Sequence, residues 1–203
     1  MSATRDTSLG GFVLRVAAWL GPAFAVWYLA APILAWPIVL LTDAVTSLAF
    51  ADLVRSIEQE GYRITILSTL KAMAGPIDHP AVGLVSVELN TLLYNLGLPM
   101  LAALSLAARP QRAWLTITLG YIVLAPFVTW GIVAEFLKHL VFDTAATVAA
   151  HAGFGPLQRE IIAFAYQFGV LILPTVAPTV FWVLVHRKFL ERFAVGTRAE
   201  AAS

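Results

Sequence analysis

The 203-residue chain contains no cysteine, which excludes disulfide bonds, thiol catalysis, thiolate metal sites and a cysteine-linked lipid anchor. Charge is also scarce, because Asp, Glu, Lys and Arg make up 12% of the chain, against about 25% in ordinary domains. Hydrophobic residues make up 60%, and the mean hydropathy is +0.82. So little polar side chain cannot cover a soluble globule of this size. The composition excludes a soluble enzyme and a disordered chain, and it predicts an integral membrane protein.

Net charge and histidine content limit the kinds of partner and cofactor that we expect the chain to bind. A formal net charge of +1 gives no basis for binding nucleic acid. Four histidines, scattered along the chain, do not support a catalytic zinc site. We therefore expect membrane lipid as the surroundings, no nucleic acid as a partner, and no cofactor.

Long apolar runs predict a mainly α membrane fold with four transmembrane helices, and we expect residues 1–203 to form a single integral membrane domain. The spans are expected at about 12–40, 91–108, 113–137 and 161–185. The first apolar run continues to residue 50, so a second interpretation divides it at Pro32 and Pro37 into two passes. We favour one span with an extension toward residue 50. The run is far longer than the roughly 7–15 apolar residues of a signal peptide, which indicates an uncleaved anchor.

The polar stretch 51–90 predicts a small antiparallel β-insert. Segments 53–58 and 62–70 flank the turn 59–61, which is a hairpin signal. Segment 82–89 alternates with period two and predicts a third strand, with valines and leucine on one face. Three strands are near the minimum for independent stability, so the insert is expected to lean on the helices or on a partner.

The charge distribution predicts the orientation. With four spans, eight of the thirteen basic residues share one side of the membrane, which also holds both termini. Nine of the twelve acidic residues share the other side. Under the positive-inside rule, both termini are cytoplasmic and the β-insert is extracytoplasmic.

One polar helix face carries Glu135, Lys138 and His139, at spacings of three and four residues. Ionisable groups near a bilayer are costly and are therefore functional candidates. A proton relay, or a metal site completed by His151, is one interpretation. The other, which we favour, is an interfacial stripe in which acid and base pair locally.

Uncharged polar groups within the expected spans form the second set of candidates: Asn90, Tyr94, Asn95, Tyr166 and Gln167. Amides and phenols in membrane helices usually bridge neighbouring helices. An alternative role is a groove that receives the transmembrane segment of another protein. The chain shows no nucleophile elbow, no phosphate-binding loop and no paired membrane aspartates.

Several strings together resemble the exosortase H-associated membrane protein family. They are residues 87–99, 130–138, 158–160 and 166–169, with Pro174. The layout is also similar, with an N-terminal anchor, a short extracytoplasmic insert and three further spans. The resemblance implies a multi-pass protein of the bacterial inner membrane that works beside an exosortase.

Exosortases, by the same resemblance, are membrane-embedded enzymes with a cysteine nucleophile that process proteins bearing a C-terminal sorting segment. This chain has no cysteine, so it is expected to be a non-enzymatic accessory protein that binds the enzyme or its substrate's sorting segment. An open strand edge, reached from Ile64 or Val85, could accept that segment by β-augmentation. Two alternatives remain: a small-solute transporter or channel subunit, and a membrane hydrolase using Glu135 and His139.

Overall fold

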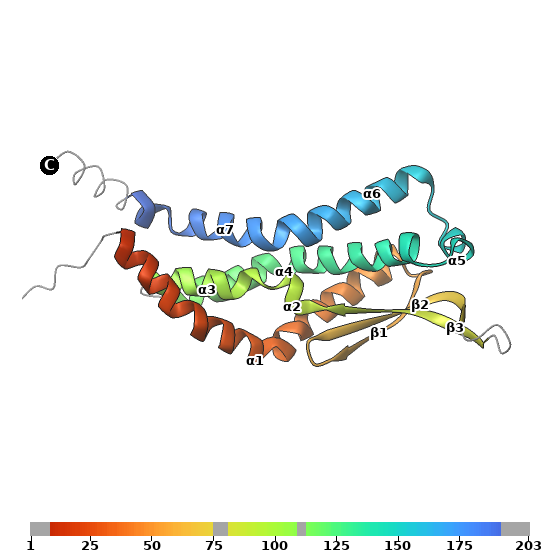
Figure 1. Ribbon diagram of the computed structural model, residues 1–203, viewed down its shortest axis with the longest axis horizontal. Helices are drawn as coiled ribbons and strands as arrows, with labels where there is room; N and C mark the ends of the chain where they lie inside the picture. The colour runs from red at the N-terminus through yellow and green to blue at the C-terminus, as the bar shows by residue number, and fades with distance from the viewer. Residues whose placement is uncertain (1–8, 75–80, 109–112, 192–203) are drawn as a thin grey trace, which may run out of the picture. The chain divides into compact units, whose positions relative to one another are not determined.

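The computed structural model describes residues 9–74, 81–108 and 113–191 (Figure 1). Residues 109–112, between the second and third expected spans, lie outside these residues. The chain runs through helices, three strands and two π-helical segments in this order: α1 (Leu9–Ala49), β1 (Val54–Glu60), β2 (Arg63–Ala74), β3 (Ala81–Asn90), α2 (Thr91–Tyr94), α3 (Gly97–Ala107), α4 (Ala113–Lys138), η1 (His139–Asp143), α5 (Ala146–His151), α6 (Pro156–Gln167), η2 (Phe168–Ile172) and α7 (Leu173–Val185).

Helix α1 is one continuous helix of 41 residues. It passes through Pro32 and Pro37, where the sequence had left open a division into two passes. At 1.5 Å per residue its length is about 61 Å, roughly twice the thickness of a hydrocarbon core. Helix α1 can therefore cross a bilayer and still extend well beyond one face of it.

Within the described residues, three helical segments are long and apolar enough to cross a membrane: Leu9–Ala49, Ala113–Asp143 and Pro156–Val185. The span expected at 91–108 is not one helix but the short α2 followed by α3, which has 11 residues. Eleven residues rise only about 16 Å, half of a hydrocarbon core. A fourth span is therefore not shown.

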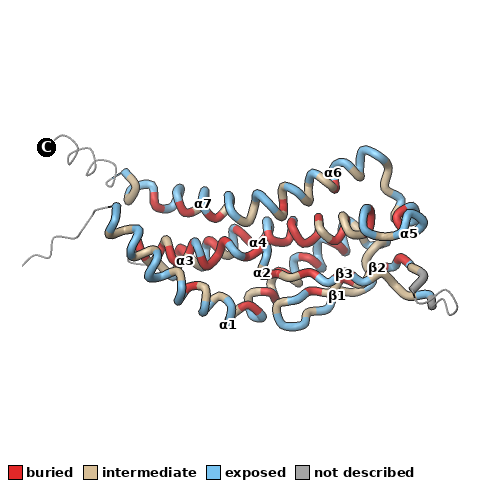
Figure 2. Tube along the Cα trace, in the orientation of Figure 1, coloured by how far each residue is buried: buried red, intermediate tan, exposed pale blue. Residues whose placement is uncertain are grey.

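The predicted three-stranded antiparallel sheet is present, with the strand order β1-β2-β3. Its central strand alternates as the sequence indicated: Ile64, Ile66 and Leu70 are buried, and Arg63 and Thr69 are exposed. Figure 2 shows the buried positions of the sheet interrupted by exposed ones. One face of the sheet thus belongs to the apolar core.

The first hairpin turn lies later than residues 59–61, where it was expected. Strand β1 continues to Glu60 and the two turn residues are Gly61 and Tyr62. Gly61 has a φ of +61°, a conformation that glycine adopts at no steric cost and that two-residue hairpin loops require. The glycine opens the turn instead of closing it.

Two compact units make up the described chain, and each combines separate stretches. The first unit contains the described parts of 1–29, 96–124 and 175–203; the second contains those of 30–95 and 125–174. In the second unit, buried residues follow one stripe of α1: Ala31, Ala35, Ile38, Thr42 and Thr46. Small side chains along such a stripe let a neighbouring element approach closely.

An aromatic cluster marks the first unit. Trp182 lies 6.2 Å from Phe12 and 5.0 Å from His186, measured between ring centroids. Nδ1 of His186 donates to the carbonyl of Trp182 at 3.1 Å, while Nε2 is buried without a hydrogen-bond partner among the described residues. Burial lowers the pKa of His186 below its ordinary value, although the backbone hydrogen bond opposes this.

The His186 environment predicts a pH dependence of stability. A histidine whose pKa is lower in the folded than in the unfolded state makes unfolding easier when the pH falls below its unfolded pKa. We expect the thermal midpoint of the purified protein to fall as the pH drops from about 7.5 to about 5. Other groups also titrate in this range, so the control is His186→Gln measured over the same range. Equal pH slopes in both proteins would contradict the prediction.

Candidate functional site

The junction between β3 and α2 holds three of the predicted residues. The side chain of Asn90 accepts a hydrogen bond from the backbone N–H of Leu92 at 3.0 Å and caps α2. Asn95 ends α2, and its backbone N–H donates to the carbonyl of Thr91 at 3.1 Å. Thr91 in turn donates through Oγ1 to the carbonyl of Tyr62 at 2.6 Å. These bonds tie the helix start to the sheet.

Tyr94 lies beside the contact between Gly131 of α4 and Gly169 of η2. Its side chain is buried, and its hydroxyl has no hydrogen-bond partner among the described residues. A Cβ placed on Gly131 would lie 2.6 Å from Cδ1 of Tyr94 and 3.1 Å from the carbonyl oxygen of Gly169. A Cβ on Gly169 would lie 3.1 Å from the Cα of Gly131. Tyr94 is therefore packed against a glycine–glycine crossing of two helical segments.

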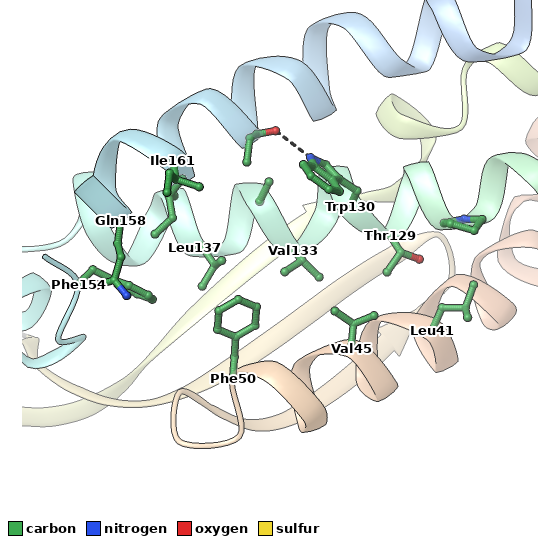
Figure 3. Close-up of a pocket in the computed structure, with 14 residues that line it drawn as sticks. Leu41, Val45, Phe50, Thr129, Trp130, Val133, Leu137, Phe154, Gln158 and Ile161 are labelled. Atoms are coloured by element: carbon green, nitrogen blue, oxygen red, sulfur yellow. Dashed lines mark hydrogen bonds between the residues drawn. The ribbon is translucent and has the colours of Figure 1, made fainter. Parts of the chain in front are cut away.

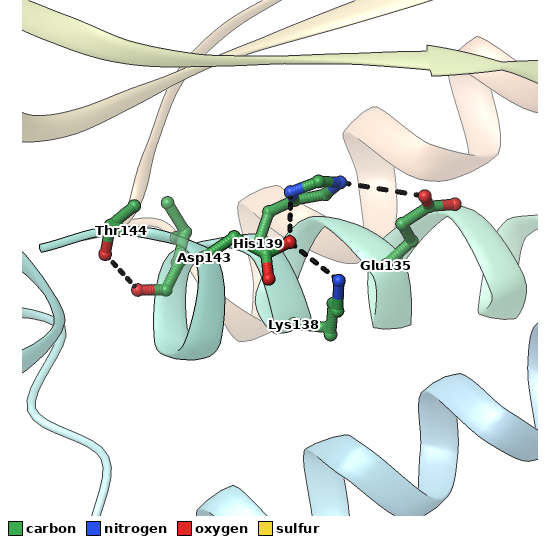
Figure 4. A network of polar contacts seen from close by, with 6 residues as sticks. Glu135, Lys138, His139, Asp143 and Thr144 are labelled. Carbon is green, nitrogen blue, oxygen red and sulfur yellow. Dashed lines mark hydrogen bonds and ion pairs between the residues drawn. The ribbon is translucent and has the colours of Figure 1, made fainter.

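A polar network lies at the end of α4 (Figure 4). Oδ2 of Asp143 is 2.7 Å from Nζ of Lys138 and 2.7 Å from Nδ1 of His139. Nε2 of His139 lies 3.6 Å from Oε1 of Glu135. Lys138 and His139 thus each have a carboxylate beside them.

The π-helical turn η1 creates that arrangement. Lys138 and Asp143 are five residues apart, which one π-helical turn brings together. The side chains are partly exposed, so each ion pair contributes at most about 1 kcal/mol. His151 does not join them; its Nδ1 lies 2.6 Å from the carbonyl of Thr147. In the described part of the chain, no group of three or more His, Asp or Glu side chains could hold a metal ion.

Tyr166 and Gln167, at the end of α6, have different surroundings. The ring of Tyr166 lies 5.3 Å from Nζ of Lys138, a cation–π contact that joins α6 to the polar network. Gln167 is exposed and makes no side-chain hydrogen bond with another described residue. Tyr166 is thus a bridge between helices, and Gln167 is a polar group on an outward helix surface.

An apolar pocket of about 480 Å³ lies in the second unit, between α1, α4 and α6 (Figure 3). The indole N–H of Trp130 donates to the carbonyl of Ala165 at 3.1 Å and closes one side. Most of the lining is aliphatic or aromatic: Leu41, Val45, Phe50, Pro126, Thr129, Trp130, Val133, Ala134, Leu137, Phe154, Gln158, Ile161, Ile162 and Ala165. Such a volume is in the range of small-molecule sites.

The two outer strands of the sheet differ in charge. Strand β1 carries Arg55, Glu58 and Glu60 among seven residues, whereas β3 carries Glu88 alone among ten. Charged side chains protect an edge strand against pairing. Strand β3 is therefore the less protected edge.

Ile64 and Val85 were expected to lie at an open strand edge, and for Ile64 this prediction is wrong. It lies on the central strand β2 and is fully buried, because the meander places the second strand between the other two. Val85 lies on the outer strand β3 and is half-buried.

Several residues of these sites had no signal strong enough to identify them. Gly131 and Gly169 are 38 positions apart, and only the helix crossing brings them together. Asp143 is the exception, because it lies four residues after His139, a spacing that places the two on one helix face and could have identified it. The lining of the pocket comes from three separate helices and reads in sequence as ordinary membrane-helix residues.

Comparison with protein families shows which family the chain resembles. A family model described as exosortase H-associated membrane protein matches residues 6–189, which is most of the chain. No curated protein and no solved structure matches the chain.

Proposed function

Because the chain belongs to the exosortase H-associated membrane protein family, we propose that it is a non-enzymatic accessory protein of an exosortase system. Its role is to bind the exosortase or the C-terminal sorting segment of the exosortase's substrate. The observation that carries the second part is the weakly protected edge of β3. An extended peptide can add to such an edge through backbone hydrogen bonds.

The pairing of β3 with β2 supports this role. Leu84 pairs with Lys71 and Ser86 pairs with Leu67, but Val85 has no partner on β2. Residues of β2 opposite the interruption bond elsewhere instead: Thr69 donates through its backbone N–H to the carbonyl of Leu53 at 3.0 Å. No described strand pairs with the outer edge of β3. An incoming peptide would therefore displace no strand that the structure describes.

The orientation we propose places the sheet on the extracytoplasmic side of the membrane and both termini in the cytoplasm. It requires four passes, of which α2 and α3 together would make the second. The asymmetric distribution of basic residues supports this. The polar face of the sheet agrees with a watery surrounding, since Arg63 and Glu88 form an exposed ion pair there. The ion pair raises the pKa of Arg63.

A non-enzymatic role is supported by the absence of cysteine from the sequence and by the local pairing of the polar network. Lys138 and His139 both contact Asp143, and His139 also lies beside Glu135. A general acid or base needs a proton-transfer group directed at a substrate. These groups are directed at one another.

Site-specific photo-crosslinking tests the proposed β3 edge. A benzophenone side chain is introduced at Val85, and the variant is expressed together with the exosortase and a protein that carries the sorting segment. In membranes of these cells, Val85 is expected to capture the exosortase or the sorting-segment protein. Ile57 is the matched control, because it is also half-buried and lies on the other outer strand.

Three results distinguish the proposals. Capture from Val85 and not from Ile57 supports peptide addition to β3. Capture from neither position, with the exosortase still co-purifying in detergent, contradicts the edge and retains the accessory role. Isolation of the chain without exosortase or substrate contradicts the accessory role as a whole.

A further inference from the structure

The pocket between α1, α4 and α6 lies beside a cationic side chain that forms no ion pair among the described residues. Nε of Arg159 donates to the carbonyl of Phe154 at 3.2 Å, and Phe154 lines the pocket. We propose that this pocket binds one acyl chain of an anionic phospholipid, whose phosphate is held by Arg159. This site is separate from the β3 edge, and the inference does not rest on the proposed function.

The lining selects an apolar ligand. Its polar side-chain atoms belong to Thr129, Trp130 and Gln158. The indole N–H of Trp130 is used by Ala165, and Oε1 of Gln158 accepts from the backbone N–H of Gly155 at 2.8 Å. The hydroxyl of Thr129 is buried without a hydrogen-bond partner among the described residues. One hydroxyl cannot satisfy the several N–H and C=O groups that an extended peptide would bury there, which is costly. An acyl chain brings no such groups.

The size of the pocket excludes a helix as occupant. A volume of about 480 Å³ is about three times that of an engineered cavity that holds benzene, which is ~150 Å³. A transmembrane helix of a partner, about 10 Å in diameter, is far too large to enter it. A single hydrocarbon chain fits the volume and the lining together.

The end of the pocket at α6 is suited to an anion. Gln158 and Phe154 line this end, and Arg159 follows Gln158 directly. Helix α6 begins at Pro156, and a helix N-terminus carries a partial positive charge. The guanidinium group offers a planar donor fork that matches a phosphate. Nε of Arg159 is held by the backbone carbonyl of Phe154, so the guanidinium lies next to a residue that lines the pocket.

Native mass spectrometry of the full chain in detergent tests the site. The probes are phosphatidylglycerol and phosphatidylcholine with the same acyl chains, each added to delipidated protein. We expect one phosphatidylglycerol to remain bound under activation that removes phosphatidylcholine. Arg159→Gln should weaken phosphatidylglycerol binding about tenfold, because a charged hydrogen bond is lost. It should weaken phosphatidylcholine binding less, because the choline cation beside that phosphate opposes the guanidinium.

Filling the pocket tests the acyl-chain part. Val45 lines the pocket and is 40% exposed, so Val45→Phe can enter the cavity without disturbing a packed core. It should lower the occupancy of phosphatidylglycerol at least tenfold, because several methylene groups would lose their burial. Val26→Phe is the matched control, since Val26 lies on the same helix, is exposed and does not line the pocket. Thermal midpoints without added lipid verify that each variant folds.

Two results in the mass spectrometry would overturn the proposal. One is equal phosphatidylglycerol binding by Val45→Phe and the original protein. The other is a lipid adduct that does not distinguish the two headgroups and does not change in Arg159→Gln. A photo-crosslinker at Ile161 that captures a partner protein, and no lipid, would also contradict it and would assign the pocket to that protein's side chains.

Discussion

Replacing Gly131 by valine is expected to destabilise the protein by about 3 kcal/mol, at the upper end of what overpacking costs. The first carbon of the new side chain would lie 2.6 Å from Cδ1 of Tyr94 and 3.1 Å from the carbonyl oxygen of Gly169. Neither neighbour can easily move: Tyr94 is 2% exposed, and the oxygen belongs to the backbone of η2. The helical segments must therefore separate.

The measurement is thermal unfolding of the purified protein in a mild detergent, where this loss corresponds to a fall of about 6–12 °C for a chain of this size. Gly21→Val is the matched control, because nothing lies within 4 Å of a Cβ at Gly21. That variant should change the stability by less than about 0.5 kcal/mol, since only helix propensity changes.

A double-mutant cycle separates the crossing from a general effect of valine. Tyr94→Leu removes the ring that a side chain at Gly131 would meet, and the hydroxyl it also removes has no hydrogen-bond partner among the described residues. The two substitutions together should cost less than the sum of the two alone, because contacting residues couple. Strict additivity would show that the contact does not limit the approach of the helices.

The β-insert was the part of the fold that the sequence determined best. Alternation from Arg63 to Ile66 depends only on the period of a strand, so a single strand carries the whole signal. The predicted turn was one or two residues too early, because a glycine between two strands can occupy either position of a two-residue loop. The failure of Ile64 as an edge position has a similar origin: pattern shows which face a residue occupies, not which neighbours flank its strand.

The second expected span shows a limit of hydropathy. Residues 91–108 are apolar enough for one helix, yet α2 ends at Tyr94 and α3 begins at Gly97. A local signal for this break exists in Pro99, which lacks a backbone N–H and is at home in the first turn of a helix. Asn90 supplies the cap of the preceding turn. Hydropathy averages over such residues, so it reports the lipid-like composition and not the break.

The sequence identified some residues of the candidate sites and missed others, for a physical reason. Glu135, Lys138 and His139 lie within five positions, so helical spacing places them together on one face. The fourth member, Asp143, lies four residues after His139 and follows the same spacing, whereas its contact with Lys138, five residues away, depends on the π-helical turn. The pocket and the glycine crossing depend on contacts between segments that are far apart in the chain, and a single sequence does not show which distant segments are in contact. Residues that lie close in sequence could therefore be grouped, but the contacts between distant segments could not be predicted.

The second large effect is expected from Ile66→Asp. Ile66 is 0% exposed on the buried face of β2, and an unpaired carboxylate there must either lose its hydration or take up a proton. We expect a loss of about 4 kcal/mol or more, which is in the range of the most damaging single substitutions. Limited proteolysis should then cut the insert in the purified protein, where the original chain resists.

Thr65→Lys is the control, since Thr65 neighbours Ile66 on the opposite, polar face of the sheet and pairs with Glu58 and Glu88, which tolerate a positive charge between them. A cost below about 0.5 kcal/mol is expected there, as for other surface substitutions. Equal protease sensitivity of the two variants would mean that the apolar face of the sheet does not pack in the protein.

The comparison also bears on β3, because an edge can accept a peptide only while the buried face holds the sheet in place. Gln59 shows how that hold is made: its amide donates to the carbonyl of Pro32 at 2.8 Å, joining the sheet to α1. If Ile66→Asp releases the sheet, capture from Val85 should be lost with it, while co-purification of the exosortase through the helices should remain.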